Sequence, residues 1–205
     1  MKKESLHALL LFWCPFFGTR AMLDLSQKMR IRIGFDWRNY FMKQRVYIDM
    51  DGVLCEYKTS VSVFDMMQPN YYLHLAPREN MIEAVRELMQ SDIADVYVLS
   101  SVFAECRDQA IWEKNCWLDE YLPEINPSHR VFSLGGTNKA DFVSSFSSTD
   151  ILCDDHTPNL MKWVNAGGKG IKIINEVNGK NGRFQAGPRL KVNEPHELLA
   201  TICAM

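Results

Sequence analysis

The segment from Val46 to Glu56, VYIDMDGVLCE, constrains the fold of this chain more than any other. A short apolar run is followed by two carboxylates, Asp49 and Asp51, and by Gly52. If the run is a buried strand, its side chains alternate in direction, so Asp49 and Asp51 point the same way beyond its carboxyl end. Such a pair can hold a divalent cation or divide the roles of nucleophile and proton donor. A plain surface turn is the alternative, because Asp-Gly is common in turns.

The charge of the chain is unevenly distributed. Residues 1–45 carry 9 Lys and Arg against 3 Asp and Glu, whereas residues 46–205 carry 14 against 22. The acidic second part has no basic stripe, which argues against a nucleic-acid polymer as partner. No uninterrupted apolar run approaches the roughly 18 residues of a membrane span, so we expect no membrane partner. The 6 cysteines include no C-x-x-C pair, which favours a reducing, cytoplasmic location without a disulfide framework.

Residues 1–44 are predicted to be an extension that precedes a single domain at 45–205. Lys2 and Lys3 stand before an apolar run at 6–18, as in a secretory signal, but the following small-residue site is poor. The same segment contains several arginines and few acidic residues, a composition that resembles a transit peptide instead. A third interpretation, which we favour, is a native start at Met42 just before the first strand, with an upstream extension that has no fold of its own.

Short apolar runs alternate with helical patterns along the rest of the chain. A helix at 59–68 falls in a predicted small helical cap at about 56–78, and Pro77 opens a clearly amphipathic helix. Strands are predicted at 46–48, 96–101, 130–134, 151–153 and 171–174, and further helices at 104–121, 159–166 and 194–203. This alternation predicts an α/β fold, a Rossmann-like core with a mostly parallel sheet and right-handed crossovers.

Polar residues collect where the predicted strands end. In a parallel sheet, ligands bind beyond the carboxyl ends of the strands. The residues at those ends are Asp49 and Asp51, Ser100 and Ser101, Lys139 after the third strand, and Asp154 and Asp155. Each has an ordinary alternative role, as a turn former, a surface lysine or a helix cap. Their order at four strand ends favours one shared site.

This set suits phosphoryl transfer through a covalent intermediate. Mg²⁺ prefers carboxylate oxygens and water, which Asp49 and Asp154 can supply while Asp155 steadies the water shell. The cation and Lys139 would neutralise the phosphate, so that Asp49 can attack the phosphorus. Ser100 would hold another phosphate oxygen. Asp51 would protonate the leaving alkoxide and then deprotonate the attacking water.

The motifs DMDGVL, VLSS, Lys139 and LCDD, in this order, resemble the four motifs of the haloacid-dehalogenase superfamily of phosphohydrolases. The resemblance spans residues 46–174. It implies a Rossmann-like core, Mg²⁺, Asp49 as nucleophile and Asp51 as acid/base. It also implies Ser100, with its neighbour Ser101, and Lys139 as phosphate ligands. The metal would be bound by Asp49, Asp154 and the backbone carbonyl of Asp51.

Longer segments resemble the 5'-deoxyribonucleotidase branch, the cytosolic type C nucleotidases and their bacterial and phage relatives. These segments are DMDGVLCEY, EKNCWLDEYLPEI, NKADF and DDHTPNLMKWVNAGGKGIKIINEVNGKNG. The branch implies a nucleoside monophosphate substrate and an aromatic residue after the first motif that stacks on the base, a position held by Tyr57. Core packing in the cap is the other role open to Tyr57. The vertebrate members have Thr-Ser-Pro in the second motif, where this chain has Ser100, Ser101 and Val102.

Other functions compatible with the sequence are a phosphatase of another small metabolite, such as a sugar phosphate, and a non-catalytic phosphate-binding protein. Retention of both Asp49 and Asp51 argues against the second. A receiver domain of a signalling relay also uses Asp, Mg²⁺ and Lys, but its acid pair comes first and its phosphorylated Asp later, unlike the order here. A homodimer is compatible with the sequence, which does not fix the oligomeric state.

Overall fold

A parallel sheet forms the centre of the computed structural model, which describes residues 43–57, 60–178, 184–194 and 197–205. Within these residues the sheet has six strands in the order β3-β2-β1-β4-β5-β6, and each neighbouring pair is parallel. The strands are β1 (Gln44–Ile48), β2 (Ala94–Val102), β3 (Arg130–Leu134), β4 (Ile151–Asp154), β5 (Lys169–Ile174) and β6 (Arg189–Lys191). The predicted α/β fold with a mostly parallel sheet is confirmed.

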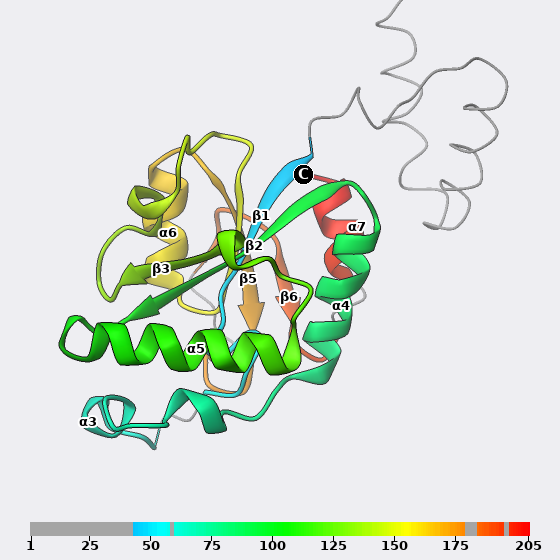
Figure 1. The fold of residues 1–205 in the computed structure, drawn as a ribbon. Helices are drawn as coiled ribbons and strands as arrows, with labels where there is room; N and C mark the ends of the chain where they lie inside the picture. The colour runs from blue at the N-terminus through cyan, green and yellow to red at the C-terminus, as the bar shows by residue number, and fades with distance from the viewer. Residues whose placement is uncertain (1–42, 58–59, 179–183, 195–196) are drawn as a thin grey trace, which may run out of the picture.

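Helices cover both faces of this sheet (Figure 1). The α-helices are α3 (Val63–Met66), α4 (Glu79–Gln90), α5 (Arg107–Tyr121), α6 (Thr157–Asn165) and α7 (Glu197–Cys203). Short 3-10 helices are η2 (Tyr72–His74), η3 (Ala104–Cys106), η4 (Pro127–His129) and η5 (Lys139–Phe142). None of the helices in the described part of the chain has the length and apolarity needed to cross a membrane.

The strands alternate strictly between two apolar clusters, as a sheet buried on both faces requires. Val46, Ile48 and Val98 pack with residues of α4, α5 and α7. Tyr47, Leu99 and Leu152 pack on the other face with residues of α6, including Trp163. Alternate side chains on β2 therefore face α5 and α6. This alternation decides which helix each candidate site residue on β2 faces.

The segment between β1 and α4, which contains the predicted cap, holds α3 and η2. The helix predicted at 59–68 is shorter, because Ser62 and Asp65 form a capping box that starts α3. Asn70, at a positive φ of 69°, follows its end. Thr59 lies outside the described residues. The amphipathic helix opened by Pro77 is confirmed as α4, which buries Met81, Ile82, Val85 and Leu88.

One strand differs from the sequence prediction, and most of one predicted segment lies outside the described residues. Strand β6 was not predicted, because it has three residues and only its middle one, Leu190, is buried. The predicted extension at 1–44 lies outside the described residues except for Lys43 and Gln44. Gln44 already belongs to β1 and pairs with Ala94 of β2.

Candidate active site

The turn after β1 places the first two carboxylates. Asp49 stays tied to the sheet, since its backbone N–H donates to the carbonyl of Cys153 at 2.9 Å. The chain then folds tightly around the carbonyl of Met50, which accepts from the N–H groups of Leu54 at 2.9 Å and Cys55 at 3.0 Å. Residues 52–55 are all buried, so the interpretation of this segment as a plain surface turn is wrong.

Gly52 is required at this turn for two reasons. Its φ of +81° lies in the left-handed region, which side chains disfavour. A Cβ atom at this position would lie 2.3 Å from Oδ2 of Asp155 and 2.9 Å from Nδ2 of Asn175. The glycine therefore lets the carboxylate after β4 approach the turn after β1.

Lys139 joins the carboxylates of two neighbouring strands. Its Nζ lies 2.9 Å from Oδ1 of Asp49 and 2.7 Å from Oδ2 of Asp154, and it also donates to the carbonyl of Leu99 at 2.8 Å. The Lys139 side chain is 1% exposed, so the alternative of a solvated surface lysine is wrong. The predicted proximity of these three residues is therefore present in the structure.

A group of three carboxylates forms a candidate divalent-cation site. Oxygen atoms of Asp49, Asp154 and Asp155 lie within 4.8 Å of one another. Other groups orient them: Asn159 donates to Asp154 at 3.0 Å, and Asn175 donates to Asp155 at 2.7 Å. Hard carboxylate oxygens held in this way fit Mg²⁺. Asp155, predicted to steady the water shell, lies within the cluster itself.

Burial and mutual repulsion raise the proton affinity of this cluster. Burial, followed by the charges of Asp154, Asp51 and Asp155, raises the pKa of Asp49 to about 8, although Lys139 opposes the shift. Burial and the charge of Asp154 likewise raise the pKa of Asp155 to about 7. Without a cation, the folded protein therefore retains protons that the unfolded chain has released.

This shift predicts a pH-dependent penalty on the metal-free fold. The ordinary carboxyl pKa is about 4, so between about pH 4 and about pH 8 the folded state binds a proton at Asp49 that the unfolded state does not. Because only the unfolded carboxyl is ionised in this window, the free energy of unfolding falls as the pH rises through it. In EDTA, Asp49→Asn should gain stability relative to wild type as the pH is raised from about 5 to about 8. Urea unfolding at each pH measures this difference, and a difference independent of pH would contradict the prediction.

Lys114, which the sequence analysis did not identify, is a second buried lysine at this edge of the sheet. It comes from α5 and is fully buried. Its Nζ forms an ion pair with the carboxylate of Asp51 and lies 2.7 Å from Oγ of Ser100. The signal in the sequence was a lysine among the apolar positions of one helix face, because α5 also buries Ala110, Trp117 and Leu118.

The predicted site residues thus divide into two groups with a lysine each. Asp49 meets Lys139, whereas Asp51, 22% exposed at its side chain, meets Lys114. Ser100 is fully buried and joins the second group. Ser101 points away, because neighbouring strand residues alternate, and its Oγ lies 3.0 Å from Oγ of Ser133.

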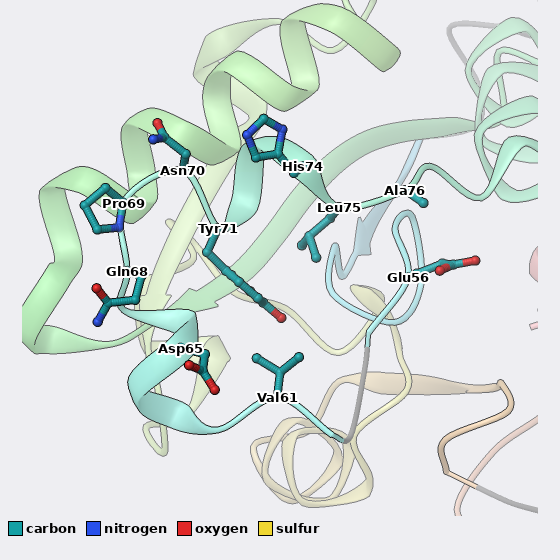
Figure 2. Close-up of a pocket in the computed structure, with 10 residues that line it drawn as sticks. All are labelled: Glu56, Val61, Asp65, Gln68, Pro69, Asn70, Tyr71, His74, Leu75 and Ala76. Carbon is teal, nitrogen blue, oxygen red and sulfur yellow. The ribbon is translucent and has the colours of Figure 1, made fainter.

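A cavity of about 360 Å³ is lined by residues from 56 to 76, in the segment that contains α3 and η2. Figure 2 shows the carboxylates of Glu56 and Asp65, the imidazole of His74 and the ring of Tyr71 among its lining residues. Tyr57 is half-buried and follows Glu56, but it is not among the described residues that line this cavity.

Comparison with known proteins supports the fold. The architecture is the Rossmann-like core that the resemblance to haloacid dehalogenases implies. No protein-family model and no curated protein matches the sequence. A solved structure of D,D-heptose 1,7-bisphosphate phosphatase from Burkholderia thailandensis matches with a TM-score of 0.52 at 11% identity, over 77% of this chain and 96% of that one. The B. bronchiseptica enzyme of the same name, complexed with magnesium and phosphate, matches with a TM-score of 0.50 at 11% identity, over 77% of this chain and 98% of that one. At this identity the likeness establishes a shared fold.

Proposed function

We propose that this protein is a Mg²⁺-dependent hydrolase of small phosphate monoesters, with Asp49 as the nucleophile. The observation that carries the proposal is the separation of the two acids of the DMDG turn. Asp49 is buried beside Lys139 and the cation cluster, whereas Asp51 is partly exposed beside Lys114 and Ser100. Two carboxylates in different surroundings can take different catalytic roles.

In the proposed reaction, a carboxylate oxygen of Asp49 forms a bond to phosphorus while the bond to the leaving oxygen breaks. Asp51 gives its proton to that oxygen, and the neutral alcohol departs. Asp51 then takes a proton from water, whose oxygen attacks the phosphorus, so that inorganic phosphate leaves and Asp49 is restored. Lys114 and Ser100 would bind phosphate oxygens through their ammonium and hydroxyl groups.

A divalent cation fits the cluster because the site holds more carboxylates than ammonium groups. The four carboxylates are those of Asp49, Asp51, Asp154 and Asp155, and the three ammonium groups are those of Lys114, Lys139 and Lys172. Asp49, Asp154 and Asp155 would hold Mg²⁺, which neutralises charge on phosphate oxygens when bound. Lys139 keeps Asp49 and Asp154 together in its absence. This arrangement supports the Mg²⁺ predicted from the sequence.

The substrate class follows from the cavity. Its described lining includes Glu56 and Asp65 and contains no Lys or Arg, so a second phosphate group would meet repulsion there. A neutral alcohol moiety suits it better. The two solved structures support a sugar phosphate as the substrate. The sequence resemblance supports a nucleoside monophosphate. Base stacking by Tyr57 stays a prediction within the second class.

A phosphate-release screen of the full chain tests this proposal. Sugar monophosphates, sugar bisphosphates, nucleoside monophosphates and phenyl phosphate are each assayed with Mg²⁺ and with EDTA. We expect release from monophosphates with Mg²⁺, a loss of release in EDTA, and weaker release from bisphosphates. Hydrolysis of nucleotides alone would select the nucleotidase over the sugar phosphatase. A lack of release from every ester in Mg²⁺ would contradict the proposed function.

A further inference from the structure

The Tyr71 side chain carries a polar group that nothing in the described structure satisfies. Its hydroxyl oxygen is buried, and no hydrogen-bond partner is found for it among the described residues. Figure 2 shows the Tyr71 ring extending into the cavity, with its hydroxyl end near Val61. A buried hydroxyl without a partner is uncommon and destabilising. A group on a ligand that occupies this cavity is the natural partner.

Helix α5 fixes the position of Tyr71 relative to the site. The Glu113 carboxylate, which is buried, accepts hydrogen bonds from the backbone N–H groups of Asn70 at 2.7 Å and Tyr72 at 3.0 Å, on either side of Tyr71. The next residue along the helix is Lys114, whose Nζ lies 4.4 Å from the centre of the Tyr72 ring. The same helix turn therefore holds both the cavity wall and the ammonium of the proposed phosphate site.

A series of side-chain contacts links the wall of the cavity to that site. The Tyr71 and Tyr72 rings pack edge to face with centres 5.0 Å apart, and Lys114 connects Tyr72 to the Asp51 carboxylate. Burial, then the charge of Asp51, raises the pKa of Tyr71 to about 12, so its hydroxyl stays protonated. Tyr71 is therefore connected through one intervening side chain, Tyr72, to the ammonium that is proposed to bind phosphate.

We propose that Tyr71 is a specificity-determining residue whose hydroxyl forms a hydrogen bond with a neutral polar group on the alcohol moiety of the substrate. The inference rests on the proposed phosphatase function and extends it to recognition of the leaving group. A hydroxyl can donate to a carbonyl or ring oxygen and can accept from a sugar hydroxyl or an amine. The acidic lining described above favours such an uncharged group over a second phosphate.

The test compares wild type with Tyr71→Phe on two substrates. One is the sugar or nucleoside monophosphate that wild type hydrolyses best, and the other is phenyl phosphate, whose alcohol moiety has no further polar group. For the first, we expect kcat/KM to fall by about three- to tenfold, the equivalent of one hydrogen bond, mainly through KM. For phenyl phosphate we expect no change. The melting temperature should stay equal or rise, because the lost hydroxyl has no partner in the described structure.

Tyr97→Phe is the matched control, because its hydroxyl donates to Asp95 on β2 at 2.9 Å and does not line the cavity. This variant should leave both kcat/KM values unchanged. Equal losses on both substrates in Tyr71→Phe, no loss on either, or a lowered melting temperature would overturn the specificity role while the phosphatase function stands. Failure of wild type to hydrolyse either ester would overturn the proposed function and this inference with it.

Discussion

Asp49→Asn is expected to lower phosphate release by on the order of a thousandfold or more. An amide cannot form the covalent phosphoryl intermediate that the carboxylate forms, so the first step is lost. The fold should survive, because the amide oxygen can still accept the hydrogen bond from Lys139, which lies 2.9 Å from Oδ1 of Asp49. The burial penalty on a negative charge is removed at the same time. Release is measured at saturating substrate with Mg²⁺.

Asp141→Asn provides the control for that variant, because Asp141 is exposed on η5, two residues after Lys139. It makes the same chemical change near the site and should retain wild-type release. Substantial release by Asp49→Asn, at a rate near that of Asp141→Asn, would remove Asp49 as the nucleophile. Asp51 would then have to be tested in that role.

Lys114→Met is expected to lower kcat/KM by about 10²- to 10³-fold, the usual cost of removing one buried donor aimed at developing charge. The methionine keeps much of the side-chain volume but cannot neutralise a phosphate oxygen beside Ser100. The loss in stability should be small, because the Asp51 side chain is 22% exposed and water can solvate it. Steady-state kinetics and urea unfolding of the same preparation separate the two effects.

Lys139→Met is the variant with which Lys114→Met is compared. Its partners are less exposed, 8% for the Asp49 side chain and 0% for Asp154, so two buried carboxylates lose their counter-ion. We expect a loss of about 3–5 kcal/mol in the free energy of unfolding in EDTA, with partial recovery in Mg²⁺. If Lys114→Met retains kcat/KM while Lys139→Met loses it without loss of stability, phosphate binding belongs to Lys139, as the sequence suggested.

The strands and the carboxylates could be predicted from the sequence because local patterns determine them. The uninterrupted apolar run 46–48 is typical of a strand buried on both faces, and Met81, Ile82, Val85 and Leu88 recur at helical spacing. Strand β6 could not be predicted, because three residues with one buried side chain have no distinctive period. Its pairing with β5 is a tertiary contact.

The lysines show where local patterns become insufficient. Lys139 follows a predicted strand, so its position at the sheet edge could be inferred. Lys114 lies in the middle of a helix, and its contact with Asp51, 63 residues away, depends on how α5 packs over the sheet. Ser101 was grouped with Ser100 although adjacent strand residues face opposite sides of the sheet. In the structure it contacts Ser133 on β3.

The central claim is that Asp49 carries the phosphoryl group during turnover. The most direct test is acid quenching of the protein with its best substrate and Mg²⁺, followed by intact-mass and peptide mass spectrometry. We predict an adduct with the mass of one phosphoryl group on the peptide that contains Asp49, absent in Asp49→Asn and in EDTA. A phosphoryl adduct on another residue, or active turnover without any adduct on that peptide, would contradict the account.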